Sequence, residues 1–153
     1  MLALVKRDAN KKMNAINQFI GDYRFLSNFH PCTIEFQGIS YPSVEHFYVA
    51  MKTVDVDIRR HISNMVNAGE VKRFGRTIKV RADWDQVKLI TMKFGVKKKF
   101  EDHNLKKLLL STGDAELIEG NNWGDTFWGV DLRTGVGENN LGKILMEIRS
   151  ESL

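Results

Sequence analysis

The chain has 153 residues, 42% of them hydrophobic and 27% charged, which is the composition of an ordinary globular protein of one domain. No apolar run approaches the roughly 20 residues that cross a bilayer, and the opening residues lack the apolar stretch of a signal peptide. We therefore expect no membrane association and a cytoplasmic location. A single cysteine, Cys32, excludes an intrachain disulfide, and the four histidines lack metal-ligand spacing, so we expect no metal.

The net charge of +4 favours an anionic ligand such as a phosphate, a nucleotide or a nucleic acid. The positive charge gathers in three segments, Lys72–Arg81, Lys97–Lys99 and Lys106–Lys107. The alternative is that these lysines form solvated helix faces, which is the commoner role of such runs.

Residues 1–18 are polar and basic with little periodicity, so we expect a loose arm followed by one domain over residues 19–153. Met13 is a candidate initiator, because recognisable order begins only at Phe19. The aromatic stretch FIGDYRFLSNF at residues 19–29 is expected to pack mostly in the core. Alternating polar and apolar residues around Gly38 predict a short β-hairpin at residues 33–41, which Pro42 ends.

The next segment, YPSVEHFYVAMKTV at residues 41–54, predicts a helix capped by Ser43. Its apolar residues recur at helical spacing and form the buried stripe Val44, Phe47, Tyr48 and Met51. Glu45 and Lys52 are seven residues apart, which places them about 20° from each other in projection and about 10 Å apart along the axis. An acid and an amine therefore leave the same flank of the helix. The alternative is a solvated face with a glutamate in the first turn.

Several further helices are expected. The second begins at Asp55 or Asp57, buries Ile58, Ile62, Met65 and Val66, and stops at Gly69, and a short turn follows at Glu70–Phe74. Asp83 with Gln86 resembles a capping box that starts a long helix to about Phe100. Because this helix is apolar on two sides, we expect it to be packed on two sides and to be the central helix of the fold. Short helices are predicted at Asn104–Leu110 and Asp114–Ile118, and a last one at about 140–150. The fold class is mainly α, a compact single domain with one hairpin.

Residues 119–139 are rich in glycine and aromatics and have no helical period, so we expect a functional loop. Asp125 and Asp131 lie in it and, with Glu45, are candidate acids, because neighbouring aromatic rings would desolvate a carboxylate and raise its pKa. The alternative is that both aspartates close turns. Basic residues before the long helix, Arg76, Lys79 and Arg81, could clamp a phosphate or form an exposed basic loop. Trp84 and Trp128 belong either to the core or to a surface that stacks on a base.

Taken together, six segments resemble the YbiA-like, or NADAR, family, in order from Phe19 to Arg149. They are FLSNF (25–29), YPSVEHFYVAMK (41–52), GEVKRFGR (69–76), RADWDQVK (81–88), LLLSTG (108–113), and DTFWGVD followed by GENNLGKILMEIR (125–149). The resemblance implies a mainly α-helical domain with N-glycosidase activity and no cofactor. It implies a phosphorylated ribosyl or ADP-ribosyl substrate, either a ribosylamino-pyrimidine phosphate of riboflavin synthesis or an ADP-ribosylated guanine, free or in nucleic acid. Two departures are the absence of a proline before Gly69 and the unmatched residues 1–18.

By position, the resemblance implies Glu45, Lys52 and Asp125 as catalytic residues. The implied substrate-binding residues are Asn28, Arg76, Arg81, Trp84, Trp128 and Asn139, and Arg24 and Tyr48 are further candidates for substrate binding. Glu45 would stabilise a cation at C1′ or activate water, and Asp125 would assist. Lys52 has two open roles, electrostatic holding of the substrate or an imine with the opened sugar. The alternatives in function are a non-catalytic ADP-ribose or nucleotide-binding module and a single-strand nucleic-acid binder. The sequence leaves the oligomeric state open.

Overall fold

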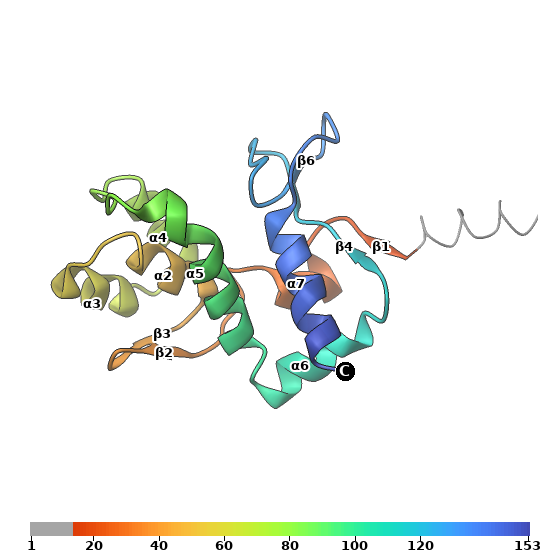
Figure 1. Ribbon diagram of the computed structural model, residues 1–153, viewed down its shortest axis with the longest axis horizontal. Coiled ribbons are helices and arrows are strands. Elements are labelled where there is room, and N and C mark those ends of the chain that lie inside the picture. Colours follow the sequence, from red (N-terminus) through yellow and green to blue (C-terminus); the bar gives the residue numbers. More distant parts are fainter. Residues whose placement is uncertain (1–13) are drawn as a thin grey trace, which may run out of the picture. The chain divides into compact units, whose positions relative to one another are not determined.

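The structure is a computed structural model that describes residues 14–153 (Figure 1). The initial part of the predicted arm, residues 1–13, lies outside the described residues. Contacts divide the chain into two compact units, which we describe separately. We call residues 28–105 the central unit, and the residues up to Ser27 together with Lys106–Leu153 the terminal unit. Six α-helices, one 3₁₀ helix and six short strands occur in residues 14–153, which confirms the mainly α fold.

The central unit begins with the predicted β-hairpin. Strands β2 (Ile34–Phe36) and β3 (Ile39–Tyr41) pair antiparallel, with Phe36 opposite Ile39. The two turn residues, Gln37 and Gly38, have φ values of 50° and 80°, which is the left-handed backbone of a tight two-residue hairpin turn. The prediction of a hairpin around Gly38 is confirmed.

Helix α2 (Val44–Ala50) follows Pro42 as predicted. Ser43 caps it, because its hydroxyl oxygen accepts a hydrogen bond from the backbone N–H of His46 at 3.1 Å. The predicted stripe is buried, and so are the residues on the remaining sides of α2 except Glu45. This burial arises because α2 packs against three helices, namely α3 (Val56–Asn64), α4 (Ala68–Gly75) and α5 (Trp84–Lys99). In Figure 1 the helix α5 runs beside α2.

Three predictions in the central unit are wrong in detail. Gly69 does not end α3, which stops at Asn64; it lies inside α4, whose cap is Asn67. Val66, expected to be buried, is 96% exposed because α3 has ended before it. Asp83 does not form a capping box, because its carboxylate pairs with Arg81 instead. The bidentate pairing with Arg81 engages both carboxylate oxygens of Asp83, which explains the difference.

The terminal unit joins the two ends of the described chain. Its elements are β1 (Ala15–Ile16), the 3₁₀ helix η1 (Gly21–Leu26), β4 (Glu116–Leu117), β5 (Gly120–Asn121), β6 (Val130–Asp131) and α7 (Asn140–Glu151). Helix α6 (His103–Ser111) carries the chain into it from the central unit. Strand β1 pairs with β4, and β5 pairs with β6, both in parallel.

Two features of the terminal unit differ from expectation. The helix predicted at Asp114–Ile118 is the strand β4, because its backbone pairs with Asn14 and Ile16 rather than with itself. The same pairing gives residues 15 and 16 regular structure within the segment expected to be an arm. The last helix is confirmed, and its apolar residues Leu141, Ile144, Leu145 and Ile148 are buried. None of the helices in residues 14–153 has the length and hydropathy needed to cross a membrane.

Candidate functional site

Glu45 and Lys52 occupy one flank of the most deeply packed helix in the central unit. Glu45 stands in the first turn of α2, and its backbone N–H donates to the carbonyl of Asn28 at 3.0 Å. Lys52 follows the end of α2, where its N–H still bonds the carbonyl of Val49 at 3.1 Å. Both side chains are half-buried rather than solvated. The buried stripe on α2 therefore fixes the helix that carries both groups.

The surroundings of Lys52 change its proton affinity. Burial lowers the pKa of Lys52 from its usual 10.5, the negative charge of Glu45 raises it, and the positive charges of Arg76 and Lys72 lower it further. The charge of Glu45 therefore acts on the amine of Lys52. Because the effect of burial is the largest, the ammonium form of Lys52 is less favoured than that of a solvated lysine.

Two aromatic rings lie next to this amine. Tyr48, one turn before Lys52, packs against Trp84 with ring centroids 5.0 Å apart and planes inclined at 56°. The Nζ of Lys52 lies 5.5 Å from the centroid of the Tyr48 ring, within the range of a cation–π contact. Both rings are nearly buried, so they form a rigid apolar wall beside the Glu45–Lys52 pair.

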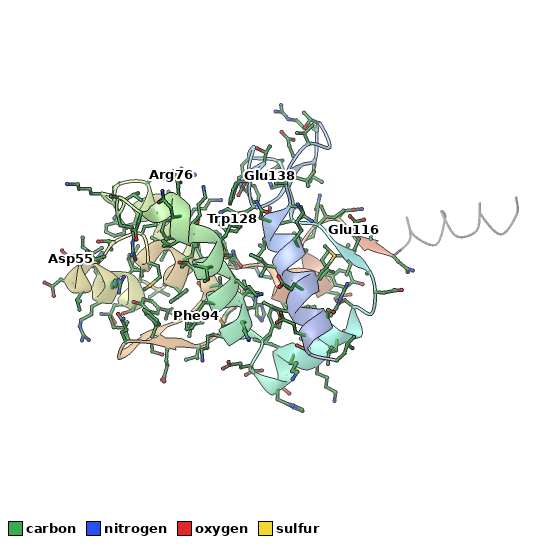
Figure 2. The ribbon with its side chains drawn as sticks, viewed as in Figure 1. Asp55, Arg76, Phe94, Glu116, Trp128 and Glu138 are labelled. Atoms are coloured by element: carbon green, nitrogen blue, oxygen red, sulfur yellow. The ribbon has the colours of Figure 1, made fainter. Side chains whose placement is uncertain are left out.

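The predicted phosphate-binding arginines differ in how they are held. Arg76 ends α4 and is exposed, and Figure 2 shows its side chain at the end of that helix. Arg81 instead binds Asp83 through both forks of its guanidinium, with Nε–Oδ1 and Nη2–Oδ2 distances of 2.6 and 3.0 Å. The backbone N–H of Arg81 donates to the carbonyl of Lys52 at 2.7 Å. Arg81 therefore supports the position of Lys52 through its main chain.

Asn28 and Lys72 are two further polar residues that act on Glu45 and Lys52. The side-chain amide of Asn28 donates a hydrogen bond to the sulfur of Met92 at 3.5 Å, while the backbone carbonyl of Asn28 accepts one from the backbone N–H of Glu45. Lys72 was not among the predicted site residues, although its charge acts on Lys52, and its Nζ lies 6.0 Å from the Phe29 ring centroid. The spacing of Lys72 and Arg76, four residues on one helix, could have indicated that they share a face.

In the terminal unit, Asp125 organises the glycine-rich loop. Its Oδ1 accepts the backbone N–H groups of Phe127 and Trp128 at 3.1 and 2.9 Å. Its own backbone is held at both polar atoms by the amide of Asn121. Within residues 14–153 its other oxygen, Oδ2, forms no hydrogen bond. Asp125 thus closes a turn and keeps one oxygen atom uncommitted.

The remaining predicted residues of the terminal unit have distinct environments. Trp128 is half-buried and meets Phe127 edge to face at 4.8 Å. Asn139 is buried, and its amide accepts from Glu119 N–H at 3.0 Å and donates to the Leu117 carbonyl at 2.9 Å. Arg24 is exposed at the end of η1. Asp131 closes a turn by accepting the N–H of Arg133 at 2.8 Å, which is the simpler of its two interpretations.

These observations define a class of protein: a small, mainly α domain that carries a half-buried carboxylate–amine pair, Glu45 and Lys52. Beside the pair lie the aromatic wall of Tyr48 and Trp84 and a cationic border, by which we mean Lys72 and Arg76. A sequence profile of the NADAR domain family matches residues 16–152, and the chain belongs to this family.

Known relatives match most of the chain. N-glycosidase YbiA of Escherichia coli is 36% identical over 85% of this chain and 82% of its own length. N-glycosidase Npun_R5314 of Nostoc punctiforme is 40% identical over 84% and 85%. The riboflavin biosynthesis protein VVA0006 of Vibrio vulnificus is 39% identical over 85% of this chain, which spans only 36% of that longer protein. The NMR structure of E. coli YbiA superposes with a TM-score of 0.76 at 32% identity, covering 92% of this chain and 89% of the other.

Proposed function

We propose that this chain hydrolyses the C1′–N bond between a phosphoribosyl or ADP-ribosyl group and an amine of a pyrimidine or guanine base. The chain is a hydrolase acting on N-glycosyl bonds, in keeping with relatives named N-glycosidase. The choice of substrate rests on the cationic border and on the relative named for riboflavin biosynthesis. The Glu45–Lys52 pair is the observation that carries the proposal.

The chemistry requires a carboxylate beside the sugar. As the C1′–N bond lengthens, positive charge develops at C1′, and Glu45 would stabilise it or take a proton from the attacking water. The water oxygen then bonds to C1′, the electron pair of the broken bond stays on the nitrogen, and the proton lost by the water neutralises the departing amine. A half-buried carboxylate suits this role, because a charge acts more strongly where water is partly excluded.

The groups around the pair suit a phosphorylated nucleoside. Lys72 and Arg76 bring positive charge to Lys52 and would attract phosphate. The Tyr48–Trp84 wall would hold the base by stacking. We assign Arg81 a positioning role, because its guanidinium is bound to Asp83 while its N–H holds the Lys52 carbonyl.

Four further predicted site residues lie in the terminal unit, Arg24, Asp125, Trp128 and Asn139, and each keeps the role that the family resemblance implies. For Asp125 we propose that Oδ1 holds the loop and that Oδ2 assists the reaction. Asn139 would act by holding the loop, because both polar atoms of its amide bind backbone groups. Arg24 and Trp128 would contact the phosphate and the base.

Lys52 remains open to the two roles that the residue type allows. We favour electrostatic holding, because Glu45 opposes the loss of its proton. An imine with the opened sugar would need the neutral amine, which burial of Lys52 also favours. Borohydride added during turnover distinguishes the two: an imine would be reduced to a stable adduct on Lys52 that mass spectrometry detects, and electrostatic holding leaves the protein mass unchanged.

The central test replaces Glu45 by glutamine and assays both substrate classes by mass spectrometry of the released base. We expect turnover to fall by at least about a hundredfold, the scale of a general acid or base. Glu35→Gln is the matched control, because Glu35 is an exposed glutamate on β2. Turnover of Glu45→Gln near that of the control would remove Glu45 from the mechanism. Calorimetric binding of ADP-ribose without release of base from either substrate would instead support a non-catalytic binding module.

A further inference from the structure

The central unit contains an open cavity that shares only Arg81 with the residues predicted for the active site. Its volume is about 310 Å³, near the lower limit of small-molecule sites. It is lined by residues of the hairpin, of α2 and its C-cap, of α3, of the segment before α5 and of α5: Phe36, Gln37, Phe47, Met51, Arg59, Arg81, Val87, Ile90, Thr91 and Phe94. From these residues we infer that the cavity is a second ligand site, which binds a small aromatic carboxylate.

The cavity lies on a different side of α2 from the proposed active site. Phe47 contributes to the cavity, while Glu45, two residues earlier, projects about 200° away around the helix. A ligand in this cavity would therefore not occupy the position of the sugar next to Glu45. The inference does not depend on the proposed hydrolysis, because it concerns binding alone.

The apolar part of the cavity suits an aromatic ring. Phe36 meets Phe47 and Phe94 edge to face, with centroids 5.7 and 5.5 Å apart, and Phe47 lies 5.5 Å from Phe94. Figure 2 shows Phe94 near the lower half of α5. Three rings in this arrangement offer both edges and faces, the contacts that a further ring prefers. Ile90, also in the lining, is 70% exposed, so an apolar residue stands at the solvent side of the cavity.

The polar part suits an anion. The lining includes two guanidinium groups, of which Arg81 is already bound to the carboxylate of Asp83, so Arg59 is the cation that a ligand would meet. Arg59 is only 8% exposed, and described residues use two of its five N–H donors: Nε donates to the Thr53 carbonyl at 2.9 Å and Nη1 to Gln37 Oε1 at 3.2 Å. A fixed guanidinium with uncommitted donors beside apolar rings is complementary to a carboxylate on an aromatic body.

The hairpin turn contributes a residue in left-handed backbone, Gln37, to the position of Arg59. A turn with two left-handed residues prefers asparagine at its first position, but this chain has Gln37 there with φ 50°. The longer side chain of glutamine reaches Arg59, which the preferred residue would do less readily. Strained backbone that supports a buried charge next to a cavity is typical of binding sites.

An NMR titration with 3-phenylpropionate tests the inference. We expect saturable shifts of the Gln37, Thr91 and Phe94 amides, with a dissociation constant on the order of a millimolar or lower. The neutral analogue 3-phenylpropanol should bind at least about fivefold more weakly, because it cannot pair with guanidinium.

Two variants sharpen the test. Ile90→Glu places a negative charge at the cavity and should weaken 3-phenylpropionate binding by at least about tenfold through like-charge repulsion. Leu89→Glu is the matched control, because Leu89 is the neighbouring residue on α5, is 46% exposed and is absent from the lining. Equal affinity for the acid and the alcohol, equal effects of the two variants, or shifts that do not saturate would each overturn the inference.

Discussion

Lys99→Met is expected to stabilise the protein at pH 6, because Lys99 is a buried amine. The side chain is 1% exposed in the last turn of α5, and its Nζ lies 5.1 Å from the Phe100 ring centroid. Burial lowers the pKa of Lys99 from 10.5 to about 7, while the charge of Cys32 acts in the opposite direction. Methionine has a similar length and no charge, so it should fill the same space.

The magnitude follows from the fall in pKa. A fall of about 3.5, at about 1.4 kcal/mol for each unit of pKa, corresponds to about 5 kcal/mol of destabilisation by the charged amine. The unfolded chain binds this proton below about pH 10.5, whereas the folded chain binds it only below about 7. Stability of the native sequence should therefore rise with pH between about 7 and 10.5, and the penalty is complete below about 7.

Urea unfolding of both proteins between pH 6 and 9 measures this effect. We expect Lys99→Met to be more stable by about 2 to 5 kcal/mol at pH 6, with the difference shrinking as the pH rises. Lys97→Met is the control, because Lys97 is exposed on the same turn and should change stability by less than about 0.5 kcal/mol. A difference that does not vary with pH, or a destabilised Lys99→Met, would refute the reasoning.

Three further substitutions test the active-site helix and its neighbours. If Lys52 acts electrostatically, Lys52→Arg should retain at least about a tenth of the native turnover, whereas Lys52→Met should lose it. Equal losses for the two variants in the release assay would contradict this role. Ser43→Ala should cost about 2 to 3 kcal/mol in urea unfolding, because it removes the cap of α2 and the partner 2.6 Å from Nδ1 of the buried His46; a loss no larger than that of the exposed Ser40→Ala would count against it. Gly95→Ala should destabilise by about 1 kcal/mol, since its Cβ would lie 2.9 Å from the Phe47 ring and overpacking outweighs helix propensity; a higher melting temperature would show that the ring can move.

Features coded by nearby residues were predictable from the sequence. Ser43 caps α2 as expected because a cap depends only on the following three residues. The hairpin around Gly38 has an equally local cause, its turn residues. The end of α5 at Phe100 also has a local cause, the loss of apolar periodicity after it. Asp83 is the informative exception: its spacing to Gln86 matched a capping box, but Arg81, two residues earlier, bound the carboxylate.

Features that depend on distant partners were not predictable. The strand β4 reads as a short helix in isolation, and only β1, about a hundred residues earlier in the chain, makes it a strand. The same holds for Lys72, whose effect on Lys52 requires α4 to pack against α2. Likewise, the cavity was not predictable: Val87, Ile90 and Phe94 of α5 line it and recur at helical spacing, and periodicity does not distinguish a packed face from one that lines a cavity.

The helix after Pro42 connects these points. Its sequence allowed a solvated acid and amine, whereas both groups are half-buried, because α3, α4 and α5 cover the rest of α2. Burial is what makes the pair chemically useful: it lowers the pKa of Lys52, and it would strengthen the effect of Glu45 on a cation at C1′. The spacing of Glu45 and Lys52 is thus a necessary condition for the proposed site, and the packing of the neighbouring helices supplies the environment in which these two residue types can act.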